Sequence, residues 1–393
     1  MTTDLEALFG PRERQAWIAL ASVHRIGEET MGLALAQFRS AQNVLEAARD
    51  GRLQAWNEVF GRARGRVPID SVAMTGIQDV ARDPYRKLDS IAELGLWTFT
   101  ALDTDYPSRL RDLDPPPAVI HGLGDRSTLT RARVVAVVGT RRPTPSGRAL
   151  TTRISTRLVE SGAVVVSGLA VGIDGAAHAA AVEREAPTVG VIGAGHHQAG
   201  PRAHARLRDE ILATGGALIS EHHPTVGATK GTYPRRNRII AALGDATIVV
   251  EAPRRSGALI TARHALELGR PVFVAPGRIG DWAVAGSLAL LRETPARPIV
   301  GLDELTEDLG FLGPMGEVES SHEGARGPAL AMLGPTERAV AQRLCAGPAG
   351  LDVLVAETGL PPGAISSAVT LLLMRGWAQA LGPAYIAAGP LAR

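Results

Sequence analysis

The stretch Val134–His178 reads VVAVVGTRRPTPSGRALTTRISTRLVESGAVVVSGLAVGIDGAAH, and its pattern decides the fold. It begins with the apolar run Val134–Val138, a turn at Gly139–Gly147 and a predicted helix. A second apolar run, 164–166, leads into the turn Ser167–Asp174 and another helix. Short Val-rich runs suit parallel strands that are buried on both faces. Both turns therefore fall at the carboxyl ends of strands, where such sheets bind ligands.

The same alternation continues to about residue 309. Helices are predicted at 148–160, 202–214, 236–243 and 259–268, and further strands at 188–192, 217–220, 246–251 and 272–275. Strands that alternate with helices in this way imply βαβ units. The fold class we expect is α/β, with a mainly parallel sheet covered by helices on both faces.

The segments on either side have other patterns. Residues 1–95 predict a unit of three helices, either a docking or capping bundle or a separate DNA-binding bundle. The α/β domain is expected at 96–309. A Gly-, Pro-, Ser- and Glu-rich linker occupies 310–334. Residues 335–393 predict three helices and a two-stranded wing, which describes a winged helix.

Composition limits what the chain can be. At 393 residues it is long enough for two or three domains, and its net charge of +2 does not by itself indicate nucleic-acid binding. Cys345 is the single cysteine, which excludes an internal disulfide and a cysteine metal cluster and favours a reducing compartment. With no apolar run near the ~18 residues that span a bilayer and no secretory signal, we expect a cytoplasmic protein without a membrane span.

Positive charge concentrates in the first glycine turn and the helix after it. Residues 131–160 hold seven arginines against one acidic residue, Glu160. Gly139 lets backbone N–H groups approach a phosphate, and the following helix N-terminus adds partial positive charge. Arg141 and Arg142 offer bidentate guanidinium contacts. The turn contains no Gly-x-Gly-x-x-Gly and no Gly-Lys-Ser/Thr, so we expect phosphate contact without a dinucleotide, triphosphate or other cofactor.

The second turn adds backbone donors at Ser167 and Gly168. Asp174 closes this turn as a predicted helix N-cap, and His178, one helical turn further on, could meet its side chain. No nucleophile is placed beside them, so a cap and its neighbour are favoured over an acid–base pair.

Two later turns also carry basic residues. Lys230 and the run Arg235-Arg236-Asn237-Arg238 flank Tyr233, which suits a groove that follows a nucleic-acid backbone and stacks one base. The turn Arg254-Arg255-Ser256-Gly257 follows another strand and opens another helix. All these turns follow strands of one sheet, so they are expected to open on the same edge. A groove with no metal cluster, activated nucleophile or triphosphate loop indicates a binding surface.

These motifs resemble the DNA-processing protein A family (DprA, also called Smf), strongly over about residues 105–291. The matching segments, in the family's order, are Asp105-Tyr106-Pro107, Pro116–Gly122, Val137–Arg141, Ser167–Asp174, Pro234–Ala241, Glu251–Ala262 and Pro276-Gly277. Several long motifs in the right order make the resemblance specific. The winged helix is consistent with it, and so is the start of the chain, taken as a SAM- or helix-hairpin-helix-like domain.

The resemblance implies an extended Rossmann-like, doubly wound domain that binds single-stranded DNA. It also implies a homodimer that protects incoming DNA and loads the recombinase RecA during natural transformation, in a family not known for enzyme activity. The strand contacts that the family motifs carry over are Gly139, Thr140, Arg141, Ser167, Gly168, Arg202, Arg236, Asn237 and Arg238. The charge and turn patterns add Arg142, Lys230, Tyr233, Ser256 and Gly257 to the expected DNA-binding set.

Three features depart from what such a protein would be expected to carry. Gly200 stands where the family has a Tyr, and Leu288 where it has an Asn, so an aromatic and an amide are missing from the expected groove. In the winged helix, the predicted helix 362–375 has Arg375 as its only charge. Reading base edges in a major groove needs outward Arg, Lys, Asn or Gln. We therefore expect this helix to pack or to contact protein.

Two other functions use the same type of sheet. One is a nucleotide phosphoribohydrolase of the LOG kind, but Pro253–Gly257 and Thr261 lack that family's Pro-Gly-Gly-x-Gly-Thr-x-x-Glu pattern, and His264 stands where its acid would be. The other is a nucleotide-sensing protein, which a nucleotide bound to purified material would favour. Fold alone does not decide among these functions.

Overall fold

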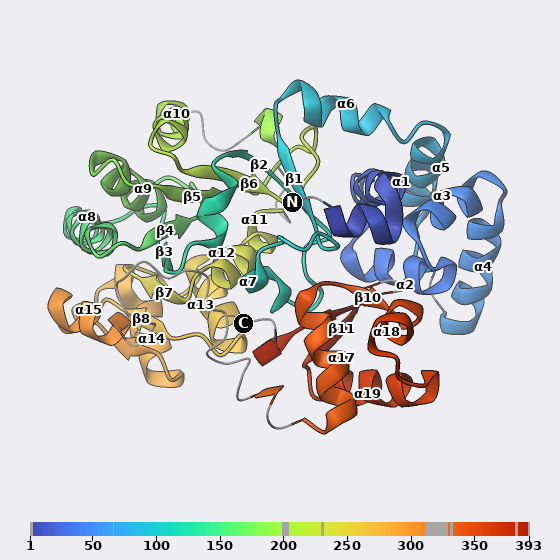
Figure 1. Cartoon of the computed structure of the whole chain (residues 1–393). Helices are drawn as coiled ribbons and strands as arrows, with labels where there is room; N and C mark the ends of the chain where they lie inside the picture. Colours follow the sequence, from blue (N-terminus) through green and yellow to red (C-terminus); the bar gives the residue numbers. More distant parts are fainter. Residues whose placement is uncertain are drawn as a thin grey trace. The chain divides into compact units, whose positions relative to one another are not determined.

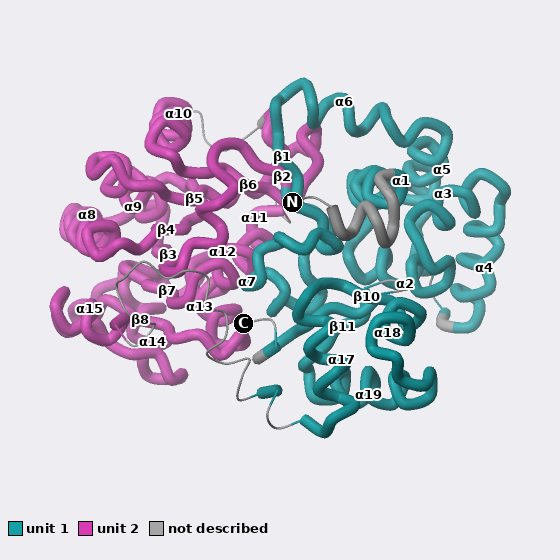
Figure 2. Tube along the Cα trace, viewed as in Figure 1, with its two compact units in different colours: residues 1–120, 321–393 teal, residues 121–320 magenta. Residues whose placement is uncertain are grey.

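The computed structural model describes residues 3–65, 67–198, 204–228, 232–310, 329–330, 333–381 and 384–391. By packing it divides into unit 1, residues 1–120 with 321–393, and unit 2, residues 121–320 (Figure 2). The four-part division expected from the sequence remains a prediction, and most of its linker falls outside the described residues. Within the described residues, no helix has both the length and the apolar character that crossing a bilayer requires.

Unit 2 is organised around a mainly parallel β-sheet (Figure 1). Its strand order is β2-β6-β5-β4-β3-β7-β8-β9, and neighbouring strands run parallel except β2 and β6. The strands are β2 (Val119–Gly124), β3 (Val134–Val138), β4 (Val164–Ser167), β5 (Thr188–Val191), β6 (Ala217–Ser220), β7 (Ala246–Val249), β8 (Val272–Val274) and β9 (Arg297–Pro298). The predicted α/β fold class is confirmed.

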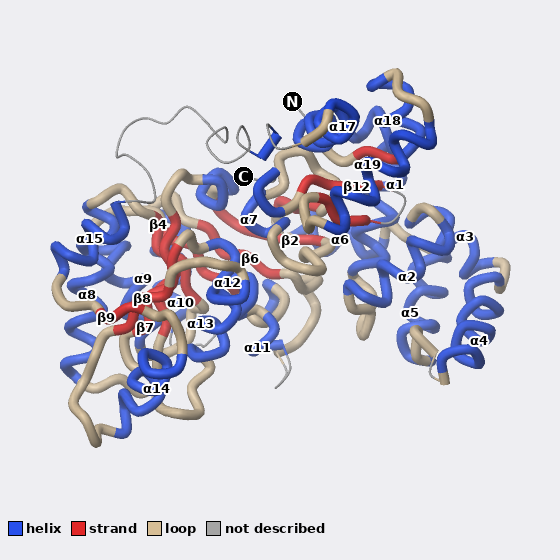
Figure 3. The backbone as a smooth tube through the Cα atoms, turned by 90° about the horizontal axis from the view of Figure 1, so that it is seen from below, coloured by secondary structure: helices blue, strands red, loops and turns tan. Residues whose placement is uncertain are grey.

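Helices cover both faces of this sheet, with α8 and α9 on one face and α12 and α13 on the other (Figures 1 and 3). The helical elements are α8 (Pro145–Glu160), α9 (Ile173–Glu183), α10 (Ala205–Ala213), α11 (Thr232–Arg235), α12 (Asn237–Leu243), α13 (Ala258–Glu267), α14 (Ala285–Glu293), α15 (Leu302–Gly310) and the 3-10 turns η1 (Arg126–Thr130), η2 (His196–Gln198) and η4 (Trp282–Val284). Helix α8 begins three residues before the predicted Arg148, because Thr144 caps it and Pro145 suits the first position.

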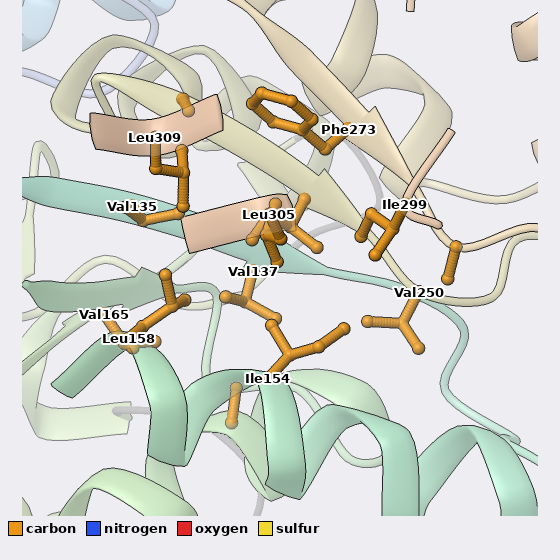
Figure 4. Packing of buried hydrophobic residues seen from close by; sticks show 14 of the residues in the cluster. Val135, Val137, Ile154, Leu158, Val165, Val250, Phe273, Ile299, Leu305 and Leu309 are labelled. Atoms are coloured by element: carbon orange, nitrogen blue, oxygen red, sulfur yellow. The ribbon is translucent and has the colours of Figure 1, made fainter. Parts of the chain in front are cut away.

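The core of unit 2 lies between the sheet and the helices on the α8 face. Val135 and Val137 of β3 pack with Ile154 and Leu158 of α8, and Phe273 of β8 belongs to the same cluster (Figure 4). The intervening Ala136 points to the other face of the sheet. There, a Cβ added at Gly244 would lie 2.9 Å from the Cβ of Ala136. Each fully buried side chain of this size contributes about 1.5–3 kcal/mol to folding, so the Val-rich run fixes the sheet's centre.

The start of unit 1 contains more helices than the three predicted. They are α1 (Thr3–Ala21), α2 (Glu28–Phe38), α3 (Ala41–Arg49), α4 (Arg52–Arg64), α5 (Ser71–Arg82) and α6 (Arg86–Glu93). Ser40 and Asp70 each accept a hydrogen bond from a backbone N–H three residues on, which starts α3 and α5. Asp83 then ends α5, and α6 follows as a separate helix.

The rest of unit 1 joins this bundle to two short elements and the winged helix. Strand β1 (Trp97–Thr100) and helix α7 (Ser108–Arg111) follow α6, and the Trp17 indole donates to the carbonyl of Ala118 (2.9 Å). The winged helix comprises α17 (Pro335–Ala346), β10 (Ala349–Gly350), α18 (Leu351–Thr358), α19 (Pro362–Met374), β11 (Ala378–Leu381), β12 (Ala384–Ala387) and the 3-10 turn η5 (Gly389–Leu391). Its strands pair in the order β10-β12-β11, so the predicted two-stranded wing gains a third short strand.

Candidate nucleic-acid interface

A cavity of about 500 Å³ lies at the carboxyl edge of the unit 2 sheet. It is lined by the turn after β3, by the segment from Tyr233 into α12 and by the loop after β7. Among the described residues, its ionic lining consists of four arginines and one carboxylate, namely Arg141, Arg142, Arg236, Arg255 and Asp174. The prediction that turns after different strands open on one edge is therefore confirmed.

The first glycine turn is held in place by the second. The N–H of Thr140 donates to Glu251 O (2.7 Å), and the N–H of Ile173 donates to Thr140 O (3.1 Å). A Cβ at Gly139 would lie 2.8 Å from the Ile173 Cβ, and one at Gly172 would lie 2.8 Å from the Arg141 Cα. Gly172 also has a φ of +96°, which other residues rarely adopt. Gly139 is thus required by the close approach of the Ile173 side chain, and Gly172 by the close approach of the Thr140 and Arg141 backbone.

Glu251, after β7, occupies the N-terminus of α8. Its carboxylate accepts hydrogen bonds from the Thr144 N–H (2.9 Å) and from the Thr144 hydroxyl. A Cβ at Gly147 would collide with this carboxylate. The partial positive charge of the helix end is therefore already matched by a protein carboxylate. Phosphate contact at the N-terminus of α8 remains a prediction, and the arginines around the cavity are the better candidates for binding an anion.

Tyr233 lies against two guanidinium groups. The Cζ of Arg141 is 5.4 Å from the ring centroid, and the Cζ of Arg236 is 5.3 Å from it. Arg236 is buried and donates to Val191 O (2.9 Å), whereas Arg141 and Arg142 are exposed. Burial lowers the pKa of Arg236, and the charge of Asp174 opposes that change. Arg236 therefore acts as a fixed support, while Arg141 and Arg142 are open to a ligand.

Asp174 is a buried carboxylate under this cationic surface. Helix α9 begins at Ile173 with Gly172 as its N-cap, so the prediction that Asp174 is the cap is wrong. Its side chain instead accepts from the Ala170 N–H (3.4 Å). Burial raises the pKa of Asp174, and the nearby Arg236 is the main opposing influence. The carboxylate is placed too far into the helix to cap it, but close to the guanidinium that needs a counter-charge.

His178 does not meet Asp174. Its Nδ1 pairs with the Thr188 hydroxyl (2.8 Å) between α9 and β5, and the ring is fully buried. Burial lowers the pKa of His178 to about 3, with help from the charges of His204 and Arg236. A neutral histidine bonded to a neighbouring strand holds α9 on the sheet. The suggestion that the two side chains meet is therefore wrong.

Three residues expected to contact DNA have partners inside the protein. Ser167 is buried and donates to Val137 O (2.6 Å). A Cβ at Gly168 would lie 2.7 Å from Arg236 Nη2, so this glycine makes room for the arginine. Arg238 forms an ion pair with Glu221, which Arg235 also approaches at 3.5 Å. These positions lie outside the cavity lining, and their direct contact with a strand remains a prediction.

The other expected contacts lie together at the cavity. The Asn237 amide donates to Gly257 O (3.2 Å), which joins the start of α12 to the start of α13. The Ser256 hydroxyl accepts from the Ala258 N–H (3.3 Å) at the beginning of α13. Gly139, Thr140, Arg141, Arg142, Tyr233, Arg236, Asn237, Ser256 and Gly257 all line the cavity. Arg202, Lys230 and Gly200 fall outside the described residues.

The lining residues that the sequence did not point to as DNA contacts include two charged residues, Arg255 and Asp174, and one aromatic residue, Trp282. Arg255 had a signal, since it lies in a recognised basic turn, and it is exposed at the cavity. Asp174 was set aside as a cap. Trp282 had no sequence signal, because a lone aromatic between a strand and a helix usually enters a core. Across the described residues, no group of three or more His, Cys, Asp or Glu side chains is arranged to hold a metal ion.

Comparison with known proteins gives a consistent answer. Residues 97–310 match the family described as DNA recombination-mediator protein A, and residues 324–382 match the DprA winged helix domain. A curated relative, the DNA processing protein DprA of Bacillus subtilis, is 38% identical over 247 residues, 62% of this chain and 82% of the relative.

Two solved structures are also similar. The crystal structure of DNA processing protein A from Streptococcus pneumoniae has a TM-score of 0.56 and 28% identity, covering 75% of this chain and 97% of that one. DNA processing protein A from Helicobacter pylori, described for its single-stranded DNA binding mode, has a TM-score of 0.50 and 30% identity, covering 55% of this chain and 95% of that one.

Proposed function

Because this chain belongs to the DNA recombination-mediator protein A family, we propose that it binds single-stranded DNA in the cavity at the carboxyl edge of the sheet. The observation that carries the proposal is the convergence of exposed Arg141, Arg142 and Arg255 on one opening. Guanidinium groups bind phosphate oxygens tightly, and a surface of this kind follows a sugar-phosphate chain whatever its sequence.

The residues of the proposed site fall into three sets. Direct contacts to the strand are assigned to exposed or lining groups, namely Gly139, Thr140, Arg141, Arg142, Tyr233, Asn237, Arg255, Ser256 and Gly257. Arg236, with Ser167 and Gly168 beneath it, supports that surface from below. Arg202, Lys230 and Arg238 are retained in the proposal as further contacts to the strand. The relative from Helicobacter pylori, with its described single-stranded DNA binding mode, supports this choice of ligand.

A binding role without catalysis is part of the proposal. An acid–base pair would need side chains that titrate near neutral pH and reach a substrate. His178 is buried, bonded to Thr188 and neutral at physiological pH, since its pKa is lowered to about 3. Asp174 faces Arg236 beneath the surface. Purified protein is expected to leave nucleoside monophosphates intact, and their hydrolysis would favour the phosphoribohydrolase alternative.

We extend the proposal to the role that the family resemblance implies. The protein would act in the cytoplasm as a homodimer that protects incoming single strands and loads the RecA recombinase during natural transformation. Sedimentation would measure the dimer. Loading would appear as faster RecA filament formation on strands that are already coated with single-strand binding protein.

A salt titration tests the central proposal. Fluorescence anisotropy would measure binding of a labelled oligonucleotide, single-stranded or duplex, between ~50 and ~300 mM salt. We expect preference for the single strand and a slope of log K against log salt of about −2, from roughly 0.7 per phosphate for three arginines. Equal binding to both forms, or an affinity that does not change with salt, would contradict it.

A further inference from the structure

Trp282 is a cavity residue that the proposed function leaves without a role. It lies in η4, between β8 and α14, and lines the same cavity as Arg141 and Arg236. Its side chain is 63% exposed, and Ile279, three residues earlier, is 97% exposed. An indole is one of the side chains that gains most from burial. An exposed indole beside a cationic cavity is therefore suited to contact with a ligand.

The backbone that carries Trp282 is fixed. Asp281 accepts from the Ala283 N–H (2.9 Å), and Ala283 and Val284 are buried beneath the turn. The N–H groups of Gly286 and Ser287 donate to Ala252 O at 2.8 and 3.0 Å, and the Ser287 hydroxyl accepts from the Ala252 N–H (3.0 Å).

Ala252 directly follows Glu251 and leads into the basic turn that contains Arg255. The start of α14 and this basic turn are therefore tied to the same strand end. The indole is held outward on an anchored element, close in the structure to the cavity's cations, although almost thirty residues separate it from Arg255 in sequence.

We propose that Trp282 stacks on a nucleobase of the strand whose phosphates contact the cavity arginines. This inference rests on the proposed function and adds a base-binding residue to it. An aromatic ring beside a cationic groove can stack on any base, so the contact would be tolerant of sequence.

The other aromatic residue of the lining is already engaged. Tyr233 has the Arg141 and Arg236 guanidinium groups within 5.4 Å of its ring centroid. Among the described residues, neither a second ring nor a cation is placed against Trp282. Of the two aromatics, Trp282 is the one that is available to a base.

Substitutions at Trp282 and two forms of the oligonucleotide test this role. Anisotropy would compare wild type, Trp282→Ala and Trp282→Phe on an oligo-dT strand and on an abasic strand of the same length. We expect Trp282→Ala to weaken oligo-dT binding on the order of tenfold. Trp282→Phe should keep most of the affinity, because it retains a ring. Loss of the indole should change neither the affinity for the abasic strand nor the salt slope.

Intrinsic fluorescence gives a second readout. Stacking on a base quenches an indole, so oligo-dT should quench wild-type emission and leave Trp282→Phe almost unquenched, although four other tryptophans remain. Tyr85→Ala, which removes a 53% exposed aromatic in unit 1, is the matched control and should bind as wild type.

Several results would overturn the inference. They are unchanged oligo-dT binding by Trp282→Ala, an equal loss on the abasic strand, or a change of oligomeric state on sedimentation, which would place the ring between copies of the chain. Failure of the proposed function looks different, because the wild type would then bind no single strand or Arg141→Ala would bind as well as wild type.

Discussion

The cavity at the sheet edge and helix α19 of the winged helix are two regions where such a chain could meet DNA, and their side chains differ sharply. The cavity brings four arginines, an amide and two aromatic rings to one opening. Along α19 the exposed side chains are short hydroxyls and aliphatic groups, namely Ser366, Ser367, Thr370, Leu371 and Met374. The Cζ of Arg375, the residue directly after α19, lies 5.5 Å from the Trp377 ring centroid.

This difference shows that a domain can have the winged helix fold without exposing the side chains that read DNA. The carboxyl-terminal segment matches a winged helix domain and folds as one, with Ile365, Val369 and Leu372 of α19 in its core. The exposed residues of α19, a helix that the structure describes throughout, include none of the Arg, Lys, Asn and Gln groups that read base edges. Met374 is 80% exposed and Leu371 is 41% exposed, which suits contact with protein. That role for α19 remains a prediction, and the following experiments test the contrast between the two regions.

The largest effect is expected at Arg236. Replacing it with alanine removes the counter-charge of buried Asp174 and leaves Val191 O without its hydrogen bond. We expect a loss of about 3 kcal/mol or more in the free energy of unfolding, together with loss of single-strand binding. Denaturant unfolding would measure the stability. Arg255→Ala, at an exposed position in the same cavity, should change stability by less than about 0.5 kcal/mol; equal losses in the two variants would refute the support role.

A matched pair of arginines gives the next effect. Arg141 and Arg375 lie at similar distances from an aromatic ring, 5.4 and 5.5 Å, but in the two contrasted regions. Arg141→Ala should weaken single-strand binding on the order of tenfold and flatten the salt slope by about 0.7, the share of one phosphate. Arg375→Ala should leave both quantities unchanged. Anisotropy at several salt concentrations measures them, and a reversed result would move the DNA site to the winged helix.

A smaller effect concerns pH. Because burial raises the pKa of Asp174, this carboxylate takes up a proton at a higher pH than an ordinary aspartate. The cavity then loses a negative charge, so single-strand affinity should rise by about threefold as the pH falls through that pKa. Because the pKa of Asp174 is higher in the folded state than in the unfolded state, its protonation at low pH stabilises the folded protein. That contribution to stability disappears as the pH rises through the folded-state pKa.

The Asp174→Asn variant separates this titration from others. It should show a flatter profile of single-strand affinity towards acidic pH than the wild type, because it has no carboxylate to protonate at this position. Anisotropy across this range, with a stability check at each pH, gives the comparison. If the variant reproduces the wild-type profile, Asp174 is ruled out as its source.

The smallest effect is expected on α19 itself. Thr370 is exposed, and its hydroxyl donates within the helix to Ser366 O (2.8 Å). Thr370→Ala should change the affinity for single-stranded or duplex DNA by less than about twofold. A clear loss for duplex alone would indicate that α19 enters a groove and would reverse the contrast drawn above.

Periodicity and turn chemistry predicted most of the α/β architecture. The strand Ala217–Ser220 has the bounds that the pattern indicated, and the recognised turns meet at one edge because parallel strands end together. The N-terminal helices were undercounted, because Ser40 and Asp70 are single capping residues inside an otherwise helical pattern.

The sequence predicted the exposed arginines of the candidate site, but not the acidic residues that hold its turns and its buried arginine in place. Arg141 and Arg142 follow from spacing alone. Glu251 and Asp174 do not, because each acts through a partner far away in the chain: Thr144 for Glu251, and Arg236 for Asp174. The exposure of Trp282 depends on which neighbours are buried beneath it, namely Ala283 and Val284, and no pattern in one sequence gives that.

Glu251 also bears on competition by small molecules. In related sheets a mobile metabolite such as a dinucleotide seats its pyrophosphate at the first helix end. In this chain the Glu251 carboxylate lies at the corresponding helix N-terminus, where it accepts hydrogen bonds from the N–H and the hydroxyl of Thr144. The Glu251 carboxylate would repel the phosphates of a free nucleotide at this helix end. A strand bound by the cavity arginines would not depend on this helix end. Under the proposed function, the arginines of the cavity hold the polyanion, and the acid at this helix end disfavours a coenzyme.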